Sequence, residues 1–362
     1  MTYGRHVYQV NTEKRRKVFA FLLKNFRPPT KTGLKNLGNT CYMNSIIQCL
    51  SNTIILAKYF YQGLYSESLN PKSNQKGQVA VEFGEVVRAL WCSQYRSISI
   101  YDLKSVVGRH HKPFQGYDQH DSHEFLIKFM DWLHDDLNKV REKFPKMEEQ
   151  NFENVPDNKA AQLVMERLEE RDASIVRTIF YGLHRSVIVC HTCSNRSLTF
   201  EPFSVLTLSF PANGRCTLKD MLHEFYKETS IEYRCDSCRR LTNCTRKFDI
   251  WKLPPVLVIH LNRFEHDILM KKKQNFVDFP LENLNLSDYL SDSYSYCTFD
   301  LYGVSNHYGT IDGGHYTAFC KSPQQTWYKF DDHEVYDISR EAVKTNAAYI
   351  LFYETTDNKT IY

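Results

Sequence analysis

The sequence predicts an α+β fold, because two kinds of periodicity occupy separate parts of the chain. From Thr32 to about Tyr181, apolar residues recur every three to four positions, which is typical of amphipathic helices. After Leu183, runs rich in β-branched and aromatic residues are separated by turn residues, which is typical of strands. Helices followed by strands, rather than helices alternating with strands, favour α+β over a parallel α/β sheet.

The composition sets broad limits on function. The 362 residues, 42% hydrophobic and 24% charged, suffice for one large domain or two small ones. The net charge of +4 is too small to indicate nucleic acid, and apolar runs such as Val18–Leu23 and Val256–Ile259 are too short for a transmembrane helix. We therefore expect no nucleic-acid partner and no membrane span.

Residues 1–31 look like a basic extension in front of the domain, ending in RPPTK. The stretch KRRKVFAFLLKNF resembles a signal peptide, but its apolar run is too short and no small-residue cleavage site follows. Eleven cysteines, an odd count without a secretion signal, favour a reducing compartment over a disulfide framework. We expect a cytoplasmic protein.

Two segments of the first part carry the clearest helical spacing. They are VAVEFGEVVRALW (Val79–Trp91) and HEFLIKFMDWLHDDL (His123–Leu137). Between them, HHKPFQGY is predicted to be a loop, and the acidic segment Met147–Lys159 is predicted to be an exposed connection. The predicted strands are, in chain order, LHRSVIVC, FSVLTLSF, PPVLVIHLNRF, FDLYGVSNHYG, HYTAFCKS, TWYKFDD and AAYILFYE.

The stretch NLGNTCYMNSIIQCL (Asn36–Leu50) places a cysteine at the start of a predicted helix. Polar residues Asn39 and Thr40 precede Cys41, and the apolar spacing begins only at Ile46. A helix N-terminus carries partial positive charge and free N–H groups, and both favour thiolate over thiol. Cys41 is therefore a candidate nucleophile, provided that a base lies elsewhere in the chain.

His315 is the best candidate for that base. It follows Gly313 and Gly314 in an otherwise β-patterned region, which suits a tight turn and close approach of a ligand to the backbone. Asp331 ends a strand-like run sixteen residues later, and two neighbouring antiparallel strands would bring it beside His315. A lone histidine in a strand is more often a core residue, but the combination with Cys41 and Asp331 favours a catalytic triad.

Two CxxC pairs frame a strand-rich segment and indicate structural zinc. They comprise Cys190, Cys193, Cys235 and Cys238. Four thiolates match tetrahedral Zn²⁺, and a closed Cys₄ site leaves no open position for water, so we expect one structural Zn²⁺ and no catalytic cofactor. The alternatives are a chance pair plus a redox CxxC, or His191 or Cys244 replacing one ligand.

Three longer stretches of the chain resemble a known family. GLKNLGNTCYMNSIIQCL, GYDQHDSHEFL and DGGHYTAFCKSPQQTWYKFDD resemble the Cys box, the acidic helix-start box and the His box of the ubiquitin-specific proteases, over about residues 32–355. IWKLPPVLVIHLNRF and KFDDHEVYDIS look most like the same stretches of an endosomal member of the family. By analogy, an association with endosomes or the nucleus is an alternative to a purely cytoplasmic location. The resemblance implies a papain-like cysteine protease of thumb–palm–fingers architecture. The catalytic domain would span 32–358, with a helical thumb at about 32–180, zinc-tipped β fingers mainly at 181–250 and a β-rich palm mainly at 251–358.

The resemblance implies roles for the residues already singled out and for two more. Cys41 would be the nucleophile, His315 the base and Asp331 the third member of the triad. Asn36 would supply an oxyanion-hole amide, and Asp332 would assist there. The implied reaction is hydrolysis of the (iso)peptide bond after the C-terminal glycine of ubiquitin through a thioester.

The resemblance also implies where ubiquitin binds. Asp121 and Glu124 match acids that pair with arginines of the ubiquitin tail. Gly309 to Gly314 would form a loop that clamps the tail, with an ordinary glycine-bearing hairpin as the alternative, and the expected contacts there are Gly313, Gly314 and Tyr316. An acid three residues before a glutamate is also a capping box, so helix capping is an alternative role. The expected partners are ubiquitin and ubiquitinated proteins, and the chain is expected to be a monomer.

Two further expectations concern details of these boxes. Asp331 and Asp332 are adjacent at the end of a strand-like run, so their side chains should point to opposite faces, and only Asp331 should reach Nδ1–H of His315. His120 and His123 stand where glutamine is more usual. The alternative functions are a catalytically silent ubiquitin-binding module of the same fold and another Cys-His-Asp acyl-transfer enzyme, such as a transglutaminase.

Overall fold

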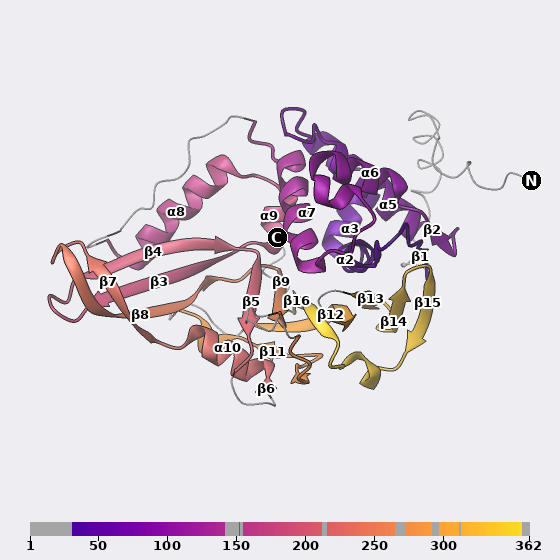
Figure 1. Cartoon of the computed structure of the whole chain (residues 1–362). Helices are drawn as coiled ribbons and strands as arrows, with labels where there is room; N and C mark the ends of the chain where they lie inside the picture. The colour runs from indigo at the N-terminus through magenta and orange to yellow at the C-terminus, as the bar shows by residue number, and fades with distance from the viewer. Residues whose placement is uncertain are drawn as a thin grey trace, which may run out of the picture. The chain divides into compact units, whose positions relative to one another are not determined.

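The structure, a computed structural model, describes residues 31–141, 152, 155–211, 216–264, 272–291, 297–310 and 313–356. The chain divides into two compact units, Met1–Asn138 with Tyr302–Val343 and Lys139–Leu301 with Lys344–Tyr362 (Figure 1). Apart from Lys31, the predicted basic extension lies outside the described residues. Among the helices that are described, none is long and apolar enough to cross a membrane.

The helices of the first unit come early in the chain. They are α2 (Cys41–Ser51), α3 (Ile54–Tyr61), α4 (Tyr65–Ser68), α5 (Gln78–Trp91), α6 (Tyr101–His110), the 3-10 helix η2 (Lys112–Gln115) and α7 (Ser122–Leu137). The two helices predicted by spacing are thus confirmed as α5 and α7. The loop predicted at HHKPFQGY contains η2, whose first turn accommodates Pro113 because an N–H there has no intrahelical partner.

Helix α2 is buried along its whole length and packs on strands of the same unit. It cannot extend toward the N-terminus, because Gly38 and Asn39 have left-handed φ angles of 95° and 55°. Glycine and asparagine tolerate this conformation better than other residues. The turn that they form therefore fixes Cys41 as the first helical residue.

Asp136 near the end of α7 holds the start of α5. Its buried carboxylate accepts hydrogen bonds from Gly77 N at 2.9 Å, Ala80 N at 3.1 Å and Ser73 Oγ at 2.5 Å. Burial raises the pKa of Asp136, although these bonds act in the opposite direction. The carboxylate satisfies N–H groups at the positive end of α5, which ties α5 and α7 together.

An antiparallel meander completes the first unit. Its strands are β12 (Thr298–Gly309), whose residues from Tyr302 belong here, β13 (Gly314–Lys321), β14 (Trp327–Asp331) and β15 (Glu334–Ile338), followed by the 3-10 helix η4 (Glu341–Val343). They pair in chain order, with Tyr308 opposite His315 and Ala318 opposite Phe330. Helix α2 packs against β13 and β14, which brings the N-terminus of α2 to the strands that carry His315 and Asp331.

The short strand β1 (Gly33–Leu34) lies beside the turn between β14 and β15. It pairs in parallel with β2 (Ser97–Ile98), and Leu34 N donates to Asp332 O at 2.7 Å. Only glycine fits at Gly33, because a Cβ there would lie 2.4 Å from His333 O. This close approach fixes the chain just before Asn36 against the turn that contains Asp332.

The second unit contains the remaining elements. They are α8 (Asp157–Arg171), α9 (Ile175–Phe180), β3 (Gly182–Cys190), β4 (Arg196–Phe203), β5 (Val205–Ser209), β6 (Cys216–Thr217), α10 (Leu218–Tyr226), β7 (Thr229–Cys235), β8 (Arg240–Lys252), β9 (Val256–Asn262), β10 (Val277–Asp278), β11 (Leu284–Asn285), the 3-10 helix η3 (Ser287–Tyr289) and β16 (Ala348–Thr355). Strands β4, β3, β8 and β7 form an antiparallel sheet in that order, while β9 pairs with β5 in parallel and with β16 antiparallel.

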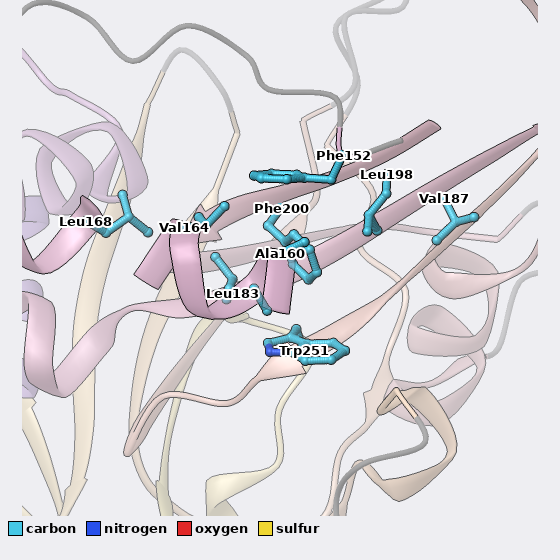
Figure 2. Packing of buried hydrophobic residues seen from close by; sticks show 10 residues of the cluster. Phe152, Ala160, Val164, Leu168, Leu183, Val187, Leu198, Phe200 and Trp251 are labelled. Atoms are coloured by element: carbon cyan, nitrogen blue, oxygen red, sulfur yellow. The ribbon is translucent and has the colours of Figure 1, made fainter. Parts of the chain in front are cut away.

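Helix α8 packs its apolar side on the β3–β4 part of this sheet. Figure 2 shows Ala160 and Val164 of α8 beside Leu183 and Phe200 of the sheet. Phe152 belongs to the same cluster and is 8% exposed, so the prediction of an exposed connection from Met147 to Lys159 is wrong at this residue. Most of that segment lies outside the described residues, but its last residues begin α8 at Asp157.

The order of the elements confirms the α+β class. Helices α2 to α9 precede nearly all the strands, and α10 is the helix within the strand-rich part that the spacing did not predict. The predicted thumb, fingers and palm boundaries stay a prediction, because the two compact units partition the chain by a different criterion.

Candidate active site

Cys41 is the first residue of α2, as predicted, and its side chain is nearly buried, with 4% exposed. Helix α2 packs on β13, the strand that carries His315, and Cys41 is the largest influence on the raised pKa of that histidine. Cys41 therefore lies at the positive end of a helix and within the influence of a base.

Asp331 ends β14 and reaches His315 on the neighbouring strand. Its Oδ1 lies 2.6 Å from His315 Nε2, and its Oδ2 lies 2.9 Å from Lys329 Nζ. The predicted pairing of the two strands is confirmed, but the expected ring nitrogen is wrong. Because Nε2 contacts Asp331, Nδ1 is the nitrogen left for Cys41.

The electrostatics of the pair follow from these contacts. The hydrogen bond with Cys41, together with the contact to Asp331, outweighs burial and raises the pKa of His315 to about 9. Burial acts to raise the pKa of Asp331, but hydrogen bonds from Lys329 and His315 outweigh it and hold that pKa below its ordinary value. The arrangement thus favours an imidazolium between two acidic groups.

The expectation that Asp331 and Asp332 point to opposite faces is wrong. One ligand atom from each of His315, Asp331 and Asp332 lies within 4.8 Å of the others. Strand β14 ends at Asp331, and Asp332 begins a tight turn with a left-handed φ of 51°. The alternation of side chains holds only within an extended strand, so the turn brings both carboxylates to the same side.

Asn36 and Asp332 form a further hydrogen-bonded pair beside the turn before α2. Asn36 Nδ2 donates to Asp332 Oδ2 at 2.9 Å, while Asn36 Oδ1 accepts from Gly38 N at 3.0 Å and Thr40 N at 3.2 Å. The two ends of the amide are therefore fixed. An amide NH₂ has two N–H donors, so one remains to stabilise negative charge on a substrate oxygen.

The acidic residues at the start of α7 have different surroundings. Asp121 is the N-cap and accepts a hydrogen bond from His123 N at 2.7 Å, so the capping alternative is confirmed for this residue. Glu124 is 52% exposed, and its Oε1 lies 3.9 Å from His111 Nε2. Burial lowers the pKa of His123, which favours its neutral form.

The hairpin before His315 carries the remaining predicted contacts. Gly309 pairs with Gly314, and Gly314 N donates to Gln119 Oε1 at 2.8 Å. A Cβ on Gly314 would lie 2.1 Å from His307 Nε2, so this position requires glycine. Tyr316 is only 7% exposed, and burial raises its pKa. Contact of ubiquitin with this hairpin stays a prediction.

The four cysteines of the two CxxC pairs meet at one end of the β3–β4–β8–β7 sheet. One sulfur from each of them lies within 4.8 Å of the others, with Cys193 Sγ 3.5 Å from Cys235 Sγ and Cys190 Sγ 4.0 Å from Cys238 Sγ. Sulfurs bound to tetrahedral Zn²⁺ at ~2.3 Å are about 3.8 Å apart, so this donor set fits the ion.

The two residues considered as substitute ligands make other contacts. Cys244 is buried in the same cluster, but its sulfur contacts Thr242. His191 Nε2 lies 2.7 Å from Thr245 Oγ1. Neither belongs to the group of four converging ligand atoms.

A cysteine at a helix start, facing a histidine and an aspartate on an antiparallel sheet, defines a protein built for thiol chemistry on acyl groups. The family model described as "Ubiquitin carboxyl-terminal hydrolase" matches residues 32–353. The chain belongs to this ubiquitin carboxyl-terminal hydrolase family.

Individual relatives agree with this assignment. Human ubiquitin carboxyl-terminal hydrolase 2 is 38% identical over 331 residues, covering 89% of this chain and 54% of the relative. The chicken protein of the same name is 40% identical over 332 residues, covering 89% of this chain and 93% of the relative. The chain thus spans about half the length of the mammalian type 2 relatives that it matches. The expected likeness to an endosomal member is not tested by these matches.

Solved structures give the same fold. The SAGA Ubp8/Sgf11/Sus1/Sgf73 DUB module bound to ubiquitin aldehyde matches with a TM-score of 0.73 and 27% identity, covering 96% of this chain and 77% of that chain. Another structure of the SAGA Ubp8/Sgf11/Sus1/Sgf73 DUB module matches with a TM-score of 0.69 and 26% identity, covering 97% of this chain and 75% of that chain. These matches confirm the predicted fold class.

Three contacting residues were not predicted from the sequence. Lys329 bonds to Asp331, Gln119 accepts from the backbone before His315, and Asn44 donates to Asp332 Oδ1 at 2.8 Å. Lys329 lies two residues before Asp331 on one strand, so both side chains are on the same face. The spacing in the sequence could therefore have indicated this contact. Gln119 and Asn44 reach their partners through the tertiary fold, which no local pattern indicates.

Proposed function

We propose that this chain is a thiol-dependent deubiquitinase that hydrolyses the bond after the C-terminal glycine of ubiquitin. The observation that carries the proposal is the placement of Cys41 at the start of α2, which packs on the two strands where His315 contacts Asp331 at 2.6 Å, in a member of this family. The presence of all three residues argues against a silent ubiquitin-binding module. The four-cysteine cluster and the match to this family argue against a transglutaminase.

The acylation step uses the residues in this order. The Cys41 thiolate attacks the carbonyl carbon of the terminal glycine, and the electron pair of the C=O bond moves to oxygen. The C–N bond then breaks, and His315 gives its proton to the leaving amine. The product is a thioester between ubiquitin and Cys41. Asp331 holds the imidazole through Nε2 throughout.

In deacylation, water replaces the thiolate as the nucleophile and attacks the thioester. His315, now neutral, takes a proton from water as the oxygen attacks the thioester carbon. The C–S bond breaks, which restores the Cys41 thiolate beside the imidazolium and releases the ubiquitin carboxylic acid, which loses its remaining proton to solvent. Both steps pass through an oxyanion, and the remaining N–H of Asn36 would stabilise it with Asp332 orienting the amide. One such donor lowers the activation barrier by ~3–4 kcal/mol in comparable sites.

Ubiquitin would reach this site along the start of α7. Glu124 is half exposed, and Asp121 lies at the N-terminus of the same helix, so two carboxylates at this helix start could attract cationic residues of an extended tail. The ubiquitin aldehyde in the solved neighbour supports ubiquitin as the partner, and ubiquitinated proteins would be the substrates. Gly313, Gly314 and Tyr316 would line the same path.

The four-cysteine cluster would hold one structural Zn²⁺ through Cys190, Cys193, Cys235 and Cys238. Bound there, the ion would supply folding free energy and join the β3–β4 and β7–β8 hairpins. In the thumb, palm and fingers scheme this sheet would be the fingers, and the helices α2 to α9, within about 32–180, the thumb. Eleven free cysteines favour a reducing compartment, and we propose the cytoplasm.

The direct test is turnover of a fluorogenic ubiquitin C-terminal reporter. Wild-type protein should hydrolyse it, and Cys41→Ala should abolish hydrolysis while ubiquitin binding remains measurable. Binding without turnover by the wild type would favour the silent module. Turnover by Cys41→Ala above about a thousandth of wild type would contradict the nucleophile assignment, because no other group here can form the thioester.

A further inference from the structure

Asn44 stands one helical turn after Cys41 and contacts the far side of the Asp332 carboxylate. Asn44 Nδ2 donates to Asp332 Oδ1 at 2.8 Å, and longer contacts of 3.4 Å join it to Leu34 O and Lys35 O. The side chain is 2% exposed. A hydrogen bond to a charged carboxylate in such a place is stronger than one between neutral groups.

The Asp332 carboxylate therefore bridges two amides. Oδ1 accepts from Asn44 and Oδ2 accepts from Asn36 at 2.9 Å. The backbone of Asp332 is also fixed, because its carbonyl accepts from Leu34 N. With both oxygens and the main chain engaged, Asp332 has little freedom, and the NH₂ group of Asn36 is held in one orientation.

The other polar atom of the Asn44 side chain, Oδ1, is unfavourable where it lies. Within the part of the chain that the structure describes, Asn44 Oδ1 is buried without a hydrogen-bond partner. An unpaired buried carbonyl destabilises a fold, and leucine, which has a similar volume, has no polar atom to leave unpaired. What asparagine offers here and leucine does not is the Nδ2 hydrogen bond to Asp332.

We propose that Asn44 is a positioning residue for the oxyanion site. It acts through Asp332 on Asn36 and does not touch the substrate. The proposal rests on the proposed function, because it concerns the same reaction. It predicts that replacing Asn44 lowers kcat and leaves ubiquitin binding nearly unchanged, because the lost hydrogen bond to Asp332 acts on the oxyanion site and not on the substrate.

A double-mutant cycle tests this. Asn44→Leu should lower kcat on the ubiquitin reporter about ten-fold, less than the 10²–10³-fold loss on removing an oxyanion donor itself. In the Asp332→Ala background, the same substitution should lower kcat less than two-fold, because Asn44 would have nothing left to position. Ubiquitin affinity, measured in the Cys41→Ala background, should change less than two-fold.

Gln48→Leu is the matched control. Gln48 is a buried amide on the same helix, but its Nε2 donates to Thr32 O and does not reach Asp332. It should change stability more than kcat. If Asn44→Leu does not fold, Asn44→Ala replaces it in the cycle, where the same loss of coupling is expected.

Two results would overturn the proposal. One is an equal factor for Asn44→Leu with and without Asp332, which would mean that Asn44 acts independently. The other is an unchanged kcat for Asn44→Leu in the wild-type background. Both presuppose turnover that depends on Cys41. A wild-type protein without such turnover would instead refute the proposed function, so the two failures are distinguishable.

Discussion

His315 Nε2 lies 2.6 Å from Oδ1 of Asp331, although the two residues are sixteen positions apart in the chain. The pairing of β13 with β14 creates this contact, and α2, which begins with Cys41, packs on both strands. The aspartate thus fixes which nitrogen faces the thiol. The account of catalysis depends on this contact and leads to the predictions below.

Asp331→Asn should keep part of the activity, while Asp331→Ala should lose much more. Asparagine can still accept a hydrogen bond from Nε2–H and so orient the ring, but it lacks the charge that stabilises the imidazolium. The measurement is kcat on the ubiquitin reporter. Asp337→Asn, an exposed change on β15, is the control and should leave kcat unchanged. Equal losses in the Asn and Ala variants would show that orientation of the ring does not matter.

His315 should make a pH-dependent contribution to the free energy of unfolding. Its pKa is raised from 6.5 to about 9, first by the hydrogen bond with Cys41. A raised pKa in the folded state means that the protonated ring stabilises the fold fully below pH 6.5, and that this contribution is lost as pH rises from 6.5 to 9. The effect should be small, because the side chain is 43% exposed and solvent screens it.

Denaturant unfolding of the wild type and His315→Gln at several pH values measures this contribution. The difference in unfolding free energy between them should shrink between pH 6.5 and 9. A difference that grows over this interval would contradict the raised pKa.

Two substitutions of Asp121 distinguish its role as a helix N-cap from its proposed role in binding ubiquitin. Asparagine is as good an N-cap as aspartate, so Asp121→Asn should keep the melting temperature but remove the charge and raise KM several-fold. Asp121→Ala should raise KM similarly and also destabilise the protein by about 1 kcal/mol through loss of the cap. A KM that is unchanged in both variants would remove Asp121 from the ubiquitin contacts and leave only the cap.

The purified protein should contain one zinc per chain. Cys235→Ser should lower both the metal content and the melting temperature, because structural Zn²⁺ contributes folding free energy. Cys244→Ser should retain the metal, since Cys244 is buried beside the site but contacts Thr242. Metal-free wild-type protein with an unchanged melting temperature would rule out the zinc site.

Much of the fold and site follows from local pattern. Hydrophobic periodicity and turn residues, which act over a few positions, predict the helix that begins at Cys41. They also predict the strands that carry His315 and Asp331. The cysteine cluster is encoded by the CxxC spacing. These features could therefore be predicted from the sequence before the fold was known.

The errors arose where a turn or a distant segment decides the geometry. The orientation of Asp332 depends on one left-handed residue, and strand alternation could not predict it. The ring nitrogen that faces Asp331 depends on how the His315 side chain is oriented between the paired strands β13 and β14. The buried position of Phe152 depends on a sheet that begins thirty residues later, at Gly182.

The most direct test of the central claim is the site of reaction with an electrophilic ubiquitin. Wild-type protein treated with ubiquitin vinylsulfone should gain the mass of one ubiquitin, and peptide mass spectrometry should place the bond on Cys41 although the chain has eleven cysteines. Cys41→Ala should remain unmodified under the same conditions. An adduct on any other cysteine, or an equally rapid reaction of Cys41→Ala, would contradict the account.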